Sequence, residues 1–114
     1  YKFVDIKNLT KEEYKIFDLT PKIISLVGIP NYRIPKIRIS ETMRVTIDDT
    51  DGVWDPSIPA IVIKRNKLNS LLEYAATLLH EIGHATTGAP DVSRAFEHIL
   101  TEYLGKTSVV AIQK

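Results

Sequence analysis

The chain has 114 residues, of which 44% are hydrophobic and 25% are charged, a size and composition typical of one globular domain. Its 15 basic and 14 acidic residues leave a net charge of +1, which gives no reason to expect a nucleic-acid partner. The absence of cysteine excludes disulfides, thiolate metal sites and cysteine nucleophiles, and it fits a reducing, cytoplasmic location. No apolar run approaches the roughly 18 residues of a membrane span, so we expect residues 1–114 to form a single domain without a membrane partner.

The first third of the chain is predicted to be mainly helical, after a short strand in the first eight residues. Thr10 and Glu13 form a capping-box pattern that places a helix start at Lys11. Thr20 is followed by a proline, which favours the first turn of a helix, so Thr20 marks a second start. We therefore predict helix over residues 11–27, with a break near Thr20.

Strands are predicted in the middle of the chain. Residues 36–40 alternate between polar and apolar side chains, and residues 60–65 form a β-branched run after a proline-rich turn. Residues 44–47 are a weaker candidate for a strand. The stretch 47–59 is rich in Asp, Gly and Pro, so we expect a loop there, with a turn over 49–52.

A mostly apolar helix is predicted over residues 71–86, where the apolar side chains recur at helical spacing. We expect Asn66 or Asn69 to cap its start, because an asparagine side chain can accept a hydrogen bond from the first turn. Gly88 and Pro90 mark its end.

A last helix is expected to start at Asp91 or Ser93 and to end near Leu104, where Gly105 follows. The tail over residues 106–114 contains several β-branched side chains and is predicted to be a strand. The order of these elements predicts an α+β fold, in which a small mixed β-sheet packs on helices.

Residues 80–84 read His-Glu-Ile-Gly-His, an HExxH motif inside the predicted helix. A helix turns by about 100° per residue, so His80 and His84 lie one turn apart on one face and can bind the same metal ion. Zn²⁺ is the metal expected for two imidazoles and a carboxylate with one open position. Glu81 lies beside the first histidine, where it can take a proton from water that the metal has acidified. The alternative is that both histidines are ordinary surface or core residues.

The third metal ligand is predicted on the last helix, since no third histidine follows the motif at short spacing. Glu97 borders the apolar stripe of that helix, and the short connection over residues 87–90 brings it back over the two histidines. We therefore favour Glu97 as the third ligand. Glu102, His98 and Asp91 are the alternatives.

Three further side chains are candidates for stabilising a transition state: Arg94, one turn before Glu97, and the tyrosines Tyr74 and Tyr103. A solvated arginine and two core tyrosines are the ordinary alternatives. The strand over 60–65 is either an edge with which an extended substrate pairs or an interior strand.

Five segments of the chain together resemble the minimal zincin domain attached to Hsp90-like ATP-binding proteins of bacteria and archaea. The segments are ISETMR (39–44), GVWDP (52–56), IVIKR (61–65), TLLHEIGHA (77–85) and GAPDVSRAFE (88–97). The HEIGH motif, flanked by a strand and followed by a helix that bears a glutamate, is also similar to the gluzincin metallopeptidases in general.

This resemblance implies a zincin-like fold with an active-site helix and a second, ligand-bearing helix. It implies zinc bound by His80, His84 and Glu97, with Glu81 as the general base of a peptidase that acts on peptides or proteins. It also implies an ATPase module in the same polypeptide, and since the chain begins at Tyr1 rather than Met, we expect a piece of a longer protein. The main alternative is a non-catalytic zinc module that regulates such an ATPase, and another is a protease for a single partner protein.

Overall fold

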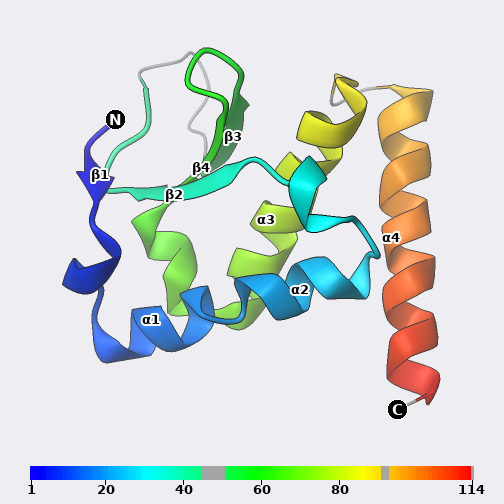
Figure 1. Cartoon of the computed structure of the whole chain (residues 1–114), viewed down its shortest axis with the longest axis horizontal. Coiled ribbons are helices and arrows are strands. Elements are labelled where there is room, and N and C mark those ends of the chain that lie inside the picture. The colour runs from blue at the N-terminus through cyan, green and yellow to red at the C-terminus, as the bar shows by residue number, and fades with distance from the viewer. Residues whose placement is uncertain (45–50, 91–92, 114) are drawn as a thin grey trace.

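The computed structural model describes residues 1–44, 51–90 and 93–113, and Figure 1 shows how the elements are arranged. The helices and strands are β1 (Phe3–Val4), α1 (Lys11–Phe17), α2 (Thr20–Leu26), β2 (Lys36–Ser40), β3 (Gly52–Asp55), β4 (Ala60–Lys64), α3 (Leu71–Thr87) and α4 (Arg94–Gln113). Short 3-10 turns cover Ile6–Asn8, Asn31–Arg33 and Arg65–Asn69. The fold is α+β with a small mixed sheet, as predicted. None of the helices in the described ranges is long and apolar enough to cross a membrane.

The strands of the sheet lie in the order β1-β2-β4-β3. β2 and β4 pair in parallel, from Lys36 opposite Ala60 to Ser40 opposite Lys64, whereas β1 and β3 run antiparallel to their neighbours. The strands predicted from residues 36–40 and from the β-branched run are therefore confirmed. β4 is interior in the described sheet, so the edge beside α3 belongs to β3.

β3 forms within residues 47–59, where the sequence predicted a loop, and that prediction is wrong. Only Val53 and Trp54 in the middle of this strand favour β structure, while its ends are a glycine and an aspartate. Pairing with the buried strand β4 supplies the stabilisation that local propensity lacks. Residues 45–50, which include most of the other expected strand and the first half of the turn over 49–52, lie outside the described residues.

The helical N-terminal third is confirmed, with the break where it was expected. The Glu13 N–H donates to Thr10 Oγ1 at 3.1 Å, and the Thr10 N–H donates to Glu13 Oε1 at 2.8 Å, which completes the capping box at the start of α1. α2 begins at Thr20 with the proline in its first turn. The two helices lie below the sheet in Figure 1 and cover one of its faces.

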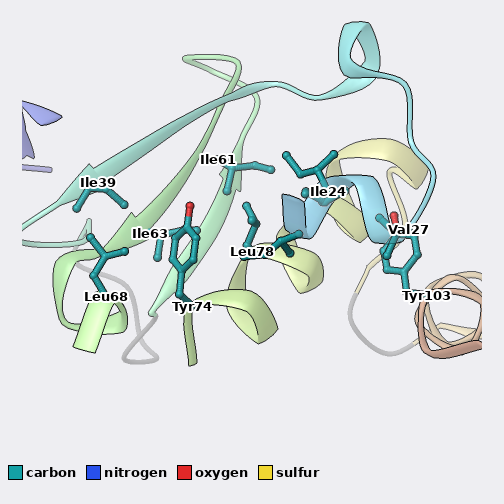
Figure 2. Close-up of a cluster of buried hydrophobic side chains, with 11 residues drawn as sticks. Ile24, Val27, Ile39, Ile61, Ile63, Leu68, Tyr74, Leu78 and Tyr103 are labelled. Atoms are coloured by element: carbon teal, nitrogen blue, oxygen red, sulfur yellow. The ribbon is translucent and has the colours of Figure 1, made fainter. Parts of the chain in front are cut away.

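The core lies between that face of the sheet and the helices, and Figure 2 shows its main side chains. They come from the sheet, from α2, from α3 with the turn before it, and from α4: Ile39, Ile61, Ile63, Ile24, Val27, Leu68, Tyr74, Leu78 and Tyr103. The buried hydroxyl of Tyr74 is hydrogen-bonded to that of Thr20 at 2.6 Å, so its polar atom is satisfied. This packing fixes α3 on the sheet beside β3.

α3 matches its predicted span but has a different cap at its start. Ser70, and neither asparagine, caps the helix, because Ser70 Oγ accepts the Glu73 N–H at 3.2 Å. At the other end Gly88 adopts a left-handed conformation with φ of 67°, and its N–H donates to the His84 carbonyl. Gly88 therefore ends the helix as expected.

α4 is longer than predicted. Ser93 Oγ accepts the Phe96 N–H at 3.1 Å at the start of the helix. The helix then continues through Gly105, so the predicted end near this glycine and the strand over residues 106–114 are both wrong. Beyond the glycine, Lys106 Nζ donates to the Val27 carbonyl at 3.1 Å, and this contact anchors α4 to the end of α2.

Candidate metal and catalytic site

A cleft of about 880 Å³ lies between the edge strand β3 and the helix α3. The residues that line it come from β3 and the positions on either side of it, from α3, and from the chain after the end of α3: Asp51, Gly52, Val53, Trp54, Pro56, Ala76, Thr77, His80, Glu81, His84, Gly88, Ala89 and Pro90. The three HExxH residues that carry chemistry thus face one hollow of the surface.

His80 and His84 lie one helical turn apart, with ring centroids separated by 5.0 Å and ring planes inclined at 73°. His84 Nδ1 lies 2.7 Å from the Ala89 carbonyl oxygen, which accepts a hydrogen bond from the Nδ1–H. The left-handed turn at Gly88 brings this carbonyl back over the end of α3. A neutral imidazole that donates from Nδ1 carries its lone pair on Nε2, the arrangement that a backbone carbonyl imposes on many metal-binding histidines.

Glu81 is only 8% exposed and lies at the edge of the sheet. The Trp54 N–H donates to Glu81 Oε1 at 3.2 Å. The Lys64 N–H donates to the Asp51 carbonyl at 2.8 Å, so by the alternation of an antiparallel pair Trp54 turns its own backbone groups away from β4. The carboxylate of Glu81 therefore occupies a pairing position on the strand edge.

The close approach of α3 to β3 depends on Gly52. A Cβ atom on this residue would lie 2.6 Å from Thr77 Cγ2 and 3.4 Å from Glu81 Cγ, so a side chain would force the strand and the helix apart. Sequence reasoning missed this contribution of β3 because it expected a loop there. The Val-Trp pair that follows the glycine is the signal that could have found the strand.

The first turn of α4 places Phe96, rather than Glu97, against the two histidines. The Phe96 ring stacks on His84, with centroids 4.1 Å apart and planes inclined at 7°, and meets His80 edge-on at 4.8 Å and 73°. Glu97 is exposed and lies outside the lining of the cleft. Among the residues that the structure describes, no group of three histidine or acidic side chains lies close enough together to hold a metal ion. The third ligand therefore stays a prediction.

The other polar candidates near the start of α4 have different surroundings. His98 and Arg94 are exposed. Glu102 pairs with Lys106 at 3.2 Å, one turn further along the helix. Asp91 lies outside the described residues. Neither His98 nor Glu102 lines the cleft, so neither joins the two histidines there.

Both candidate tyrosines pack in the core. Tyr74 is fully buried, and burial raises its pKa to about 12. Tyr103 is 3% exposed, its hydroxyl lies 3.5 Å from Thr86 Oγ1, and burial raises its pKa as well. Neither ring lines the cleft, so the ordinary alternative describes both residues.

Comparisons of the chain with protein-family models, with curated proteins and with solved structures gave no match. The geometry of the site is what indicates its chemistry. That geometry comprises two imidazoles one turn apart, a nearly buried carboxylate, and a strand edge that shares their cleft.

Proposed function

We propose that this chain is a zinc-dependent peptidase domain with a zincin-like arrangement of strand edge, active-site helix and ligand-bearing helix. The observation that carries the proposal is that His80, Glu81 and His84 line one cleft beside the edge strand β3. Two imidazoles are typical zinc ligands, and an adjacent carboxylate is a typical general base.

The donor set suits a zinc ion. The two imidazoles share one face of α3, and the Ala89 carbonyl favours the His84 tautomer that presents Nε2. We assign the third position to Glu97, because its neighbour Phe96 contacts both imidazoles and this turn of α4 therefore borders the site. The exposed carboxylate of Glu97 has to turn toward the histidines. When bound, zinc supplies a Lewis acid that polarises a carbonyl group and lowers the pKa of water.

β3 offers a place for the backbone of a substrate. It is the last strand of the described sheet, and alternate residues, Gly52 among them, turn their backbone groups away from β4. An extended peptide can hydrogen-bond to such groups as an added strand, which brings its backbone beside Glu81. The substrate class that fits is therefore an extended peptide or an unfolded segment of a protein.

Glu81 is the general base in this proposal. Its carboxylate takes a proton from the water that attacks the carbonyl carbon of the substrate, and a C–O bond forms. It then delivers that proton to the amide nitrogen as the C–N bond breaks, so that the products are a carboxylic acid and an amine. The Trp54 N–H orients the carboxylate, and Gly52 allows α3 to approach the strand closely enough for this hydrogen bond.

The test measures zinc content and peptide hydrolysis separately on the whole chain. The double variant His80→Ala, His84→Ala should lose the near-stoichiometric zinc of the parent chain, whereas His98→Ala, which removes an exposed histidine of α4, should retain it. Glu81→Gln should keep the zinc and lose hydrolysis of a peptide mixture by about 10²–10⁴-fold.

Two results would overturn the proposal in different ways. A parent chain that binds no added zinc removes the metal site itself. A parent chain that binds zinc but cleaves neither peptides nor unfolded proteins overturns the general peptidase in favour of the two alternatives, a zinc module that regulates an attached ATPase or a protease for a single partner protein. The assignment of Glu97 is tested by Glu97→Gln, which should weaken zinc binding, against Glu102→Gln on the same helix, which should not.

A further inference from the structure

We infer that Phe96, with Gly83 beneath it, is a positioning residue that fixes the orientation of both histidine rings before a metal arrives. The inference rests on the proposed zinc site, and it concerns residues that do not themselves bind zinc. It explains why the first turn of α4 directs an aromatic ring, rather than a carboxylate, at the HExxH pair.

The Phe96 ring contacts both imidazoles in complementary ways. It stacks on His84 with centroids 4.1 Å apart and meets His80 edge-to-face at 4.8 Å and 73°, two arrangements that are favourable between aromatic rings. The two imidazoles are themselves inclined at 73°. Because one rigid ring meets both of them, it couples their orientations.

Phe96 is itself held firmly in place. It is 3% exposed, and its backbone N–H donates to Ser93 Oγ at 3.1 Å in the first turn of α4. Figure 1 shows α4 turning back alongside α3 after the short connection. The ring is therefore anchored by its helix rather than by the histidines, so it can act on them as a fixed surface.

Gly83 provides the space that the ring occupies. A Cβ on Gly83 would lie 3.0 Å from Phe96 Cε2, which is tighter than ordinary contact, and 3.5 Å from Ile99 Cγ2, an ordinary contact distance. The glycine between the two histidines thus lets α4 come close enough for the ring to reach them. This gives the middle of the HEIGH sequence a role in packing at the site.

His84 is consequently held in two independent directions. The Ala89 carbonyl fixes Nδ1 in the plane of the ring at 2.7 Å, and Phe96 covers one face of the ring. Rotation of the imidazole would break the hydrogen bond and the stack together. A ligand that is already oriented loses less conformational freedom when it binds a metal, so removal of Phe96 should weaken zinc binding.

The experiment compares zinc affinities, measured by competition with a chromophoric chelator, in Phe96→Leu and in the matched control Tyr103→Leu. Both changes remove a buried aromatic ring from α4. The described ring contacts of His80 and His84 include Phe96 but not Tyr103. Phe96→Leu should weaken zinc binding by about 10–100-fold and Tyr103→Leu by less than about threefold. Circular dichroism of each variant establishes that the measurement is made on folded protein.

The variant Gly83→Ala and an NMR measurement test the contact between the Phe96 ring and the histidines separately from the loss of core packing. Gly83→Ala retains Phe96 but displaces its ring, so it should weaken zinc binding less than Phe96→Leu does. In the metal-free chain, the upfield NMR shift of the His84 ring protons caused by stacking should disappear in Phe96→Leu and persist in Tyr103→Leu.

Failure of the inference and failure of the proposed function give different results. If the parent chain binds no zinc, the proposed function falls and the inference falls with it. If the parent chain binds zinc and Phe96→Leu binds it as tightly, or if Tyr103→Leu weakens it equally, the inference alone is overturned.

Discussion

Two carboxylates of this chain, Glu13 and Glu81, are held in contrasting ways. Glu13 accepts hydrogen bonds from Nε and Nη2 of Arg65, both at 2.9 Å, and the same guanidinium pairs with Glu41. Glu81 accepts a hydrogen bond from the backbone N–H of Trp54 and faces a cleft of about 880 Å³. The first carboxylate is held by the guanidinium of Arg65, whereas the second accepts a backbone N–H of β3 at the edge of a cleft.

The difference separates a structural cluster from the proposed catalytic one. Arg65 lies at the end of β4 and joins it to α1 through Glu13 and to the end of β2 through Glu41, so the ion pairs hold three elements together. A carboxylate in a guanidinium fork stays ionised and serves the fold. A carboxylate held by a strand edge within a cleft can exchange protons with a substrate, which is what the proposed function requires of Glu81.

The largest effect on stability is expected from Arg65→Ala. The substitution removes the cation that pairs with the carboxylates of Glu13 and Glu41, and the Glu13 side chain is only 13% exposed. We expect the free energy of unfolding in urea to fall by about 3 kcal/mol. The control Arg94→Ala removes an exposed arginine and should change it by less than about 0.5 kcal/mol. Zinc content at a temperature where the variant is folded should not change, and a loss of zinc there would contradict the separation of the two clusters.

Gly52→Ala should affect the site more than the fold. The new Cβ meets Thr77 Cγ2 at 2.6 Å and Glu81 Cγ at 3.4 Å, so α3 must move from β3. We expect a loss of about 1–2 kcal/mol in the free energy of unfolding. Hydrolysis should fall at least tenfold, since a misplacement of about 1 Å is costly to catalysis.

Gly105→Ala is the matched control for that substitution. A Cβ at Gly105 has no atom within 4 Å beyond its own helix and neighbours, and the residue lies inside α4. This change should raise the free energy of unfolding by about 0.5–1 kcal/mol, because alanine favours helix, and should leave hydrolysis unchanged. Equal losses of hydrolysis in the two glycine variants would show that Gly52 has no particular role at the site.

Elements with strong local signals were predictable from the sequence. The capping box of Thr10 and Glu13 placed α1, and alternation of side chains placed β2. β3 was not predictable, because its pairing with β4 stabilises a segment of weak strand propensity. The length of α4 was missed because a glycine usually ends a helix, whereas here the helix continues past Gly105 and Lys106 contacts the end of α2.

The site residues also differ in how far local spacing could predict them. The motif identified His80, Glu81 and His84 because helical spacing alone puts them together. The contacts of Phe96 depend on how α4 is rotated against α3, and a shift of one residue in a helix turns a side chain by about 100°. From the sequence, Glu97 was favoured as the side chain that faces the histidines, but the packing of α4 against α3 directs Phe96 at them instead. That packing cannot be read from the spacing of residues within one helix.

The effect that addresses Glu13 directly is a dependence of stability on pH. The side-chain hydrogen bonds from Arg65 hold the pKa of Glu13 at about 2, below its ordinary value of 4.5. The unfolded chain therefore binds this proton first, so the stabilisation is complete above about pH 4.5 and is lost as the pH falls toward about 2. With solvent screening taken into account, we expect this contribution to be about 1–2 kcal/mol. Urea unfolding across that range should show a smaller loss in Glu13→Gln than in the parent chain, while Glu12→Gln, at an exposed neighbour, should follow the parent. If Glu13→Gln has the same pH profile as the parent, the guanidinium fork does not hold the carboxylate ionised, and the contrast with Glu81 loses its basis.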